Sequence, residues 1–145
     1  MLFRLMREAG FKVDLQATDW NTIISRRTSQ KPVKEGGWNM FFTNWAAADL
    51  VNPAVNFPIG GRGKNGGWFG WAEDPQAEKL KLDFARAQTP EEQKKIAAEI
   101  QQEVYDQVLY IPLGQFVQPS AWRKSLTGVL DGPATPIFWN MDKTE

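Results

Sequence analysis

Asp49 is the residue whose type and neighbours first suggest a chemical role. It follows Trp45 and a run of three alanines within residues 44–53. A lone carboxylate beside small residues and a tryptophan suits the binding of an ammonium group better than proton transfer. The alternative is that Asp49 caps a short helical turn that begins near Asn52 or Ala54. The residues themselves leave both interpretations open.

The remaining acids and the missing residue types argue against catalysis. The acids of residues 91–103 recur on what we expect to be the solvent face of a helix. The chain has no histidine and no cysteine, which excludes a histidine-based hydrolytic triad and a thiolate metal site. A glycosidase needs two carboxylates across a pocket, and only Asp49 has a suitable position. We therefore expect neither an enzyme nor a cofactor, and no metal site.

Residues 61–66 spell G-x-G-x-x-G. A dinucleotide site needs that pattern between a strand and the first turn of a helix, where backbone N–H groups meet the pyrophosphate. Here Pro58 precedes the glycines and the aromatic stretch 68–71 follows them. We interpret the segment as a loop at the rim of a cleft, not as a nucleotide site.

The composition describes an ordinary globular chain that is rich in aromatic residues. Seventeen basic residues balance seventeen acidic ones, which is not the footprint of a nucleic-acid-binding protein. Seven tryptophans and nine phenylalanines supply rigid contact area of the kind that binding clefts use. Arg4 and Arg7 interrupt the short apolar start, so we predict no signal peptide in this chain.

The elements that would position Asp49 are predicted as a βαβ unit. Residues 2–9 show helical spacing before Gly10, and residues 11–17 alternate as in a strand. A helix capped by Thr18 or Asp19 follows, and the aromatic residues 38–45 indicate a buried strand. Asp49 would then lie beyond the carboxyl end of that strand, where open α/β sheets bind ligands.

Helix signals dominate the second half of the chain. Asp74-Pro75 and Thr89-Pro90 each place a capping residue before a proline, and both are followed by an amphipathic pattern. Residues 109–117 are apolar and contain Pro112 and Gly114, which predicts an edge strand. The proline-rich tail beyond residue 117 is expected to pack on another surface.

With these features in order, the chain resembles the last third of the family-5 solute-binding proteins, the dipeptide, oligopeptide and nickel binders of bacterial ABC importers. Trp45, Asp49, Asn52 and Pro53 match a family signature, with one extra residue between Trp45 and Asp49 and with Asn52 in place of the usual acid. Further matching segments are residues 10–13, 71–76, 111–113 and 123–129.

The resemblance implies a fold and a division of the chain. We expect an α/β fold, namely the C-terminal part of a type II periplasmic-binding protein, a two-lobed clamshell. Residues 1–117 would form the C-terminal part of the second lobe, and residues 118–145 would return to pack on the first lobe. That first lobe would precede Met1, so the chain is expected to be a fragment.

The resemblance also implies a function. The full-length protein would work outside the cytoplasm, in the periplasm, and would deliver peptides or similar small solutes to the membrane permease subunits, with ATP used by a separate subunit. Asp49 would pair with the α-ammonium group of a ligand. The predicted pocket-lining residues are Asn44, Trp45, Ala46, Ala47, Trp68 and Phe69. Alone, the chain is expected to bind poorly and to self-associate.

The rival interpretation is a carbohydrate-binding module. Such modules use flat, exposed tryptophans, for which Trp38, Trp68 and Trp71 are the candidates. They are usually all-β, so substantial helix content would exclude this class.

Overall fold

The computed structural model describes residues 2–130 and 137–144. The chain divides into two compact units, residues 1–43 and residues 44–145, which are called here the N-terminal and C-terminal units. Within the described residues, no helix is both long and apolar enough to cross a membrane.

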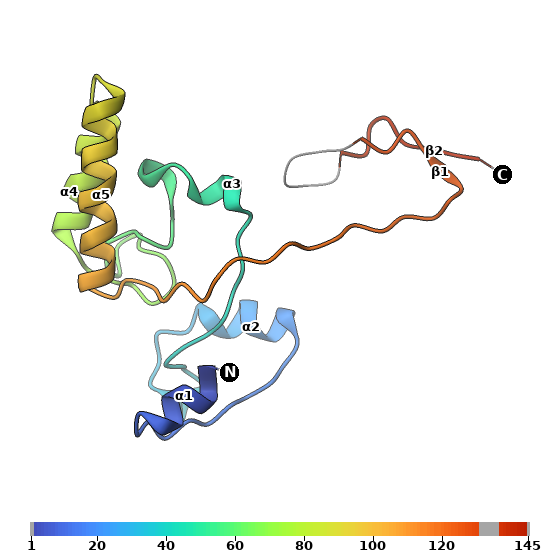
Figure 1. Cartoon of the computed structure of the whole chain (residues 1–145). Helices are drawn as coiled ribbons and strands as arrows, with labels where there is room; N and C mark the ends of the chain where they lie inside the picture. Colours follow the sequence, from blue (N-terminus) through green and yellow to red (C-terminus); the bar gives the residue numbers. More distant parts are fainter. Residues whose placement is uncertain (1, 131–136, 145) are drawn as a thin grey trace. The chain divides into compact units, whose positions relative to one another are not determined.

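The N-terminal unit holds two short helices, α1 (Leu2–Glu8) and α2 (Trp20–Arg27), and the 3₁₀ helix η1 (Val33–Glu35) (Figure 1). Asp19 is the N-cap of α2, as predicted, and accepts a hydrogen bond from the Thr22 N–H at 3.0 Å. Gly10 ends the α1 segment with a φ of 91°, a conformation that glycine adopts without strain.

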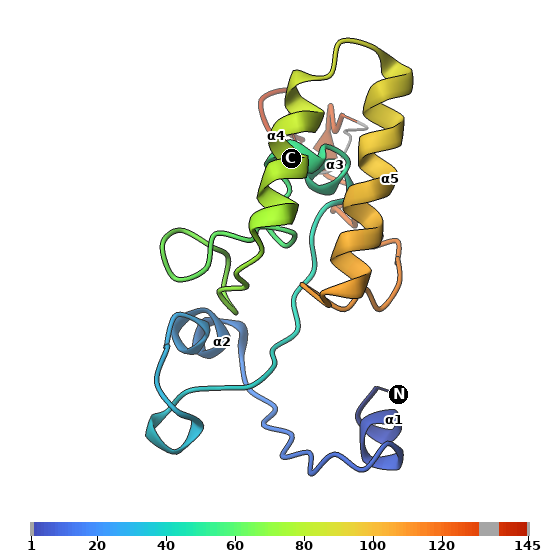
Figure 2. The same cartoon turned by 90° about the vertical axis from the view of Figure 1, so that its left-hand side faces the viewer.

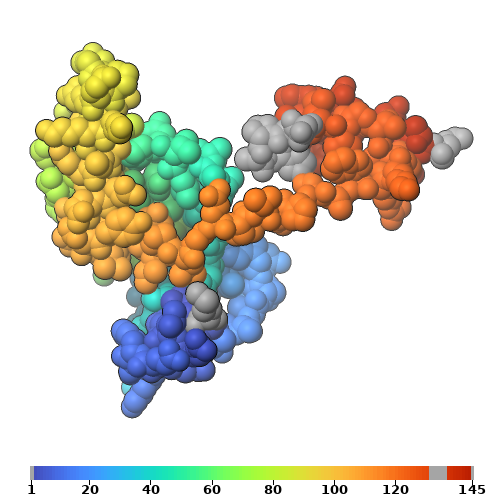
Figure 3. All heavy atoms as spheres, viewed as in Figure 1, coloured from blue at the N-terminus to red at the C-terminus, as the bar shows by residue number. Residues whose placement is uncertain are grey.

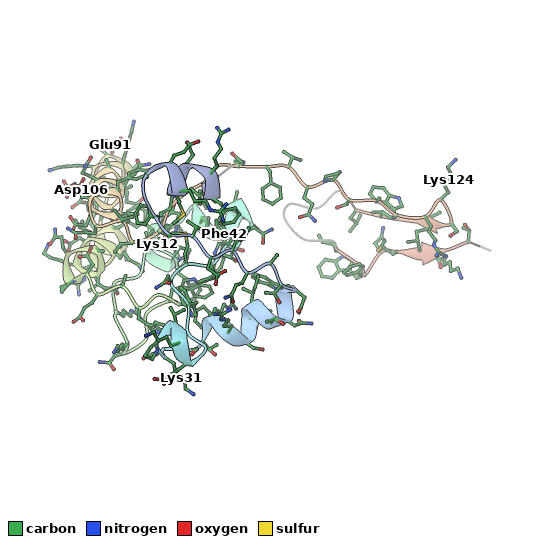
Figure 4. The ribbon with its side chains drawn as sticks, turned by 90° about the horizontal axis from the view of Figure 1, so that it is seen from below. Lys12, Lys31, Phe42, Glu91, Asp106 and Lys124 are labelled. Atoms are coloured by element: carbon green, nitrogen blue, oxygen red, sulfur yellow. The ribbon has the colours of Figure 1, made fainter. Side chains whose placement is uncertain are left out.

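Side-chain contacts hold the loops of this unit. The Arg26 guanidinium donates to the Gly37 carbonyl at 2.8 Å. The rings of Phe3 and Phe42 meet edge to face at 5.3 Å between centroids, and Phe42 is labelled in Figure 4. Few residues here are buried, so these contacts and the helix caps define the local structure.

The predicted βαβ unit is not formed. Residues 11–17 and 38–45 are extended or irregular and take part in no strand. A strand needs a partner for its backbone N–H and C=O groups, and among the described residues neither segment has a ladder partner. The prediction of two strands was therefore wrong for this chain, whereas the helix between them was confirmed.

The C-terminal unit is built on a helical hairpin. Helices α4 (Pro75–Arg86) and α5 (Pro90–Asp106) lie side by side, as the two views show (Figures 1 and 2). Asp74 and Thr89 are their N-caps, both as predicted. The capping box of α5 is shifted by one residue, because the Glu92 carboxylate accepts from the Gln88 N–H and not from that of Thr89.

A small apolar core joins this hairpin to the preceding loop. Its buried members are Ile59, Leu80, Ile100 and Val104, with Phe84, Ile96 and Leu109 packed against them. Ile59 precedes the glycine-rich segment, so the core fixes one end of that segment against α4 and α5. Two shorter helices, α3 (Ala47–Leu50) and η2 (Pro53–Val55), complete this part of the unit.

The chain after α5 forms little regular structure. Residues 109–117 are not a strand, contrary to the prediction, and residues 110–124 are all exposed. This stretch is drawn in orange in Figure 3. Strands β1 (Leu126–Thr127) and β2 (Asp142–Lys143) pair antiparallel. Of the predicted return segment 118–145, residues 131–136 and 145 lie outside the described part of the chain.

Candidate ligand-binding site

Four aromatic rings gather in the C-terminal unit. The ring of Trp45 lies 5.0 Å from that of Trp68 and 6.3 Å from that of Phe57, centroid to centroid. Trp68 also contacts Phe57 at 6.0 Å and Phe69 at 4.7 Å. These separations are in the range at which aromatic pairs attract one another. We call Trp45, Phe57, Trp68 and Phe69 the aromatic cluster.

The cluster is only partly covered. Trp45, Trp68 and Phe69 are half-buried, and Phe57 is 62% exposed. The indole Nε1 of Trp45 is buried without a hydrogen-bond partner. The cluster therefore presents apolar ring surface, which suits an apolar part of a ligand, whereas the Trp45 N–H is enclosed within the protein.

Asn52 and Asn56 shape the turn that separates Trp45 from Phe57. The Asn52 side chain accepts from the Ala54 N–H at 3.0 Å and so caps η2. Asn56 is buried, and its side-chain amide donates to the Leu50 carbonyl at 3.1 Å. These two contacts fold the chain back, and this brings rings that are twelve residues apart together.

The glycine-rich segment is a close-packed loop, not a phosphate cradle. A Cβ on Gly61 would overlap the Asp74 carbonyl oxygen, and one on Gly67 would overlap that of Gly63. Gly63 and Gly66 have φ values of 60° and 114°, which glycine adopts without strain. The glycines are therefore required for close backbone approach within the loop.

Hydrogen bonds fasten this loop at the start of α4. The Gly63 N–H donates to the Ala72 carbonyl at 2.8 Å, and the Asp74 N–H donates to the Gly61 carbonyl at 2.9 Å. Arg62 and Glu73 form an isolated β-bridge. Trp68 and Phe69 thus extend from a loop whose two ends are joined directly to each other.

Glu78, on α4, is the most connected carboxylate near the cluster. Its Oε1 accepts from the Gly61 N–H at 2.9 Å, and its Oε2 accepts from the Arg62 guanidinium at 3.0 Å. The Lys81 ammonium lies 3.5 Å from Oε1. Burial raises the pKa of Glu78, but the Gly61 N–H and the two cations outweigh it, so that the pKa falls below its usual value.

Asp49 lies in the first turn of α3 with its carboxylate exposed. Its N–H donates to the Ala46 carbonyl at 3.0 Å. The alternative role, as cap of the next turn, is wrong because Asn52 caps that turn. Ammonium binding by Asp49 stays a prediction.

The other predicted pocket residues lie beside Asp49 or in the cluster. Ala46, half-buried, is the residue before α3, and Ala47 is its exposed first residue. Asn44 begins the C-terminal unit and is exposed. The structure brings together Trp45, Trp68 and Phe69. The structure adds Phe57 to this group, a residue that the sequence analysis did not predict. Phe57 stands between Asn56 and Pro58 and belongs to no helical or strand periodicity. The only signal for it in the sequence is the aromatic richness of this region.

No group of three or more acids that could hold a metal ion is found within residues 2–130 and 137–144. The tryptophans proposed for a carbohydrate platform belong to two different units of the chain. Trp68 packs within the aromatic cluster, and Trp38 belongs to the N-terminal unit, where its ring meets that of Phe41 at 4.9 Å.

No family model matches the chain. It is 36% identical, over 139 residues, to a probable peptide ABC transporter periplasmic-binding protein, y4tO, of Sinorhizobium fredii (strain NBRC 101917 / NGR234). The match covers 95% of this chain. The likeness confirms the predicted resemblance to a part of an importer's solute-binding protein.

The chain spans 26% of the length of that relative. The relative is a periplasmic-binding protein, whereas the described part of this chain is mainly helical with one small sheet. The likeness therefore supports the protein class and leaves the arrangement of lobes as a prediction.

Proposed function

We propose that this chain is the C-terminal part of the solute-binding protein of an ABC importer that captures peptides. The single observation that carries the proposal is the likeness, over nearly the whole chain, to a probable peptide ABC transporter periplasmic-binding protein. The function is binding and release, with no chemistry on the ligand. In the full-length protein, this part would contribute one wall of the ligand cleft in a type II clamshell.

The candidate site supports a peptide better than other cargo. The aromatic cluster offers ring surface for an apolar side chain of the ligand. Asp49 follows Trp45 by four residues and would pair with the α-ammonium group. Asn44, Ala46 and Ala47, the chain neighbours of Trp45, would line the pocket beside it.

The remaining partners follow from this role. A first lobe would close over the ligand and shield the charge pair from water, which strengthens the pair. Lobe closure would then present the loaded protein to permease subunits in the membrane, outside the cytoplasm. Residues 118–145 would pack on the first lobe.

The carbohydrate-binding alternative loses support from the structure. Such modules are usually all-β, whereas this chain forms α4, α5 and three shorter α-helices, with only two-residue strands in the described part. We therefore do not favour it.

The proposal is tested by titrating the full-length protein, purified without refolding, with short peptides and with oligosaccharides in a calorimeter. Peptide binding without oligosaccharide binding is expected. Native mass spectrometry of the same preparation should show a co-purifying peptide. Binding of oligosaccharides alone would contradict the proposal.

A further inference from the structure

Phe57 is the most exposed member of the aromatic cluster. It is 62% exposed, so apolar packing alone does little to fix its ring. Its backbone, by contrast, is held from both sides. Asn56 before it is buried, and the Phe57 carbonyl accepts from the Gly60 N–H at 3.0 Å.

The contacts on both sides of Phe57 converge on one ion pair of α4. Immediately before Phe57 in the chain, the Asn56 carbonyl accepts a hydrogen bond from the Lys81 ammonium at 3.4 Å. After Phe57 in the chain, the Gly61 N–H and the Arg62 guanidinium donate to the Glu78 carboxylate at 2.9 and 3.0 Å. Lys81 and Glu78 are themselves 3.5 Å apart. One pair of side chains therefore bridges residues 56–62 to the helix.

This pair differs from the surface ion pairs of the same hairpin. The side chains of Lys81 and Glu78 are 10% and 22% exposed, whereas those of Lys95 and Glu99 on α5 are 79% and 49% exposed. Exposed pairs contribute little, but a largely buried charge is costly unless its partners are in place. Loss of either Glu78 or Lys81 should therefore release the segment that both of them hold.

We propose that Glu78 and Lys81 are positioning residues that fix the relative positions of the rings in the aromatic cluster. They do so by holding the backbone before and after Phe57 and the loop that leads to Trp68. Glu78 acts through its hydrogen bonds with Gly61 and Arg62. The consequence for peptide affinity rests on the proposed function, whereas the consequence for ring geometry does not.

The experiment compares Glu78→Ala, Glu78→Gln and the control Glu99→Ala in the full-length protein. The first readout is the exciton couplet in far-ultraviolet circular dichroism that two indoles produce when their rings lie as close as those of Trp45 and Trp68, 5.0 Å apart. A Trp68→Phe variant identifies that couplet among the other tryptophan signals. The second readout is the affinity for a peptide with an apolar side chain.

Glu78→Ala is expected to reduce the couplet without a ligand present, with the helix signal retained, and to weaken peptide binding by about tenfold. Glu78→Gln keeps an oxygen that can accept from the Gly61 N–H, so its couplet and its peptide affinity should lie between those of Glu78→Ala and the wild type. Glu99→Ala should change neither.

A wild-type couplet and affinity in Glu78→Ala would overturn the positioning role and leave the proposed function standing. A wild-type protein that binds no peptide would overturn the proposed function, and the couplet measured in the same samples would still decide the positioning role. A variant that loses its helix signal is replaced by Lys81→Met, for which the same reduced couplet is expected and an unchanged couplet would count against the proposal.

Discussion

At the scale of the residue, side chains at helix starts determine much of what is ordered in this chain. Asp74 is 6% exposed, and its Oδ1 accepts from the N–H groups of Gln76 and Ala77, each at 3.0 Å. Its backbone N–H also joins the glycine-rich loop through Gly61. One residue therefore begins α4 and closes the loop that carries Trp68.

Replacing Asp74 by alanine is expected to lower the free energy of unfolding by about 1 kcal/mol, because two helix N–H groups lose their acceptor. Thermal denaturation followed by circular dichroism measures the loss. The matched control is Asp106→Ala at the last residue of α5, labelled in Figure 4, where an acid at a helix C-terminus adds no favourable dipole term. A loss as large in Asp106→Ala would contradict the capping role.

Local signals made these caps predictable. Asp19, Asp74 and Thr89 act on backbone groups two or three residues away, so a short stretch of sequence contains both partners. The sequence offered Asp49 as a possible cap of the turn that begins at Pro53, whereas Asn52 caps it. Both residues precede that turn and both carry a side-chain oxygen, so the sequence alone did not distinguish them. Phe57 could not be predicted, since its partners Trp45 and Trp68 lie about a dozen residues away along irregular loops.

At the scale of the element, the four longer helices α1, α2, α4 and α5 were predicted correctly, whereas the three predicted strands did not form. Helices α4 and α5 satisfy their backbone hydrogen bonds internally and pack on each other. Residues 11–17, 38–45 and 109–117 have strand-like composition but lack a neighbouring strand in the structure. Strand formation depends on pairing with distant chain, which composition and alternation do not reveal.

Truncation of Ile100 should destabilise the helical hairpin. Ile100 is 3% exposed and belongs to the same core cluster as Leu80 and Val104. Ile100→Ala is expected to cost about 2–5 kcal/mol by leaving a cavity. Leu82→Ala is the control, because Leu82 on α4 is 56% exposed. Chemical denaturation of both variants measures the difference, and equal losses would contradict the assigned core.

The contact between α4 and the glycine-rich loop should depend on pH. The pKa of Glu78 is lowered from its usual 4.5, so the stability that its ionised form supplies is complete above that pH and is lost as the pH falls through the lower, folded-state pKa. The free energy of unfolding should therefore decrease on acidification below 4.5.

Glu78→Gln should remove that part of the pH dependence, as measured by denaturant titration at several pH values. The control is Glu99→Gln, whose carboxylate lies 4.0 Å from the exposed Lys95 and which should keep the wild-type slope. An identical slope in wild type and Glu78→Gln would show that the Glu78 contacts do not depend on its charge.

At the scale of the whole molecule, two observations fit the proposal that this chain works as part of a longer protein. The chain covers 26% of that relative, and apolar side chains between residues 110 and 122 are exposed, among them Phe116 and Val117. The proposed first lobe would account for their exposure. The boundary predicted at residue 117 stays a prediction.

Calorimetry with wild-type and Asp49→Ala full-length protein is the most direct test of peptide capture. A peptide with a free amino terminus should bind the wild type, and Asp49→Ala should lose roughly 2–5 kcal/mol of binding free energy, because the ammonium group would be buried without its partner. Asp106→Ala should bind as the wild type does, and an N-acetylated peptide should bind weakly to all three. Unchanged affinity of Asp49→Ala for the free peptide would contradict the proposed site.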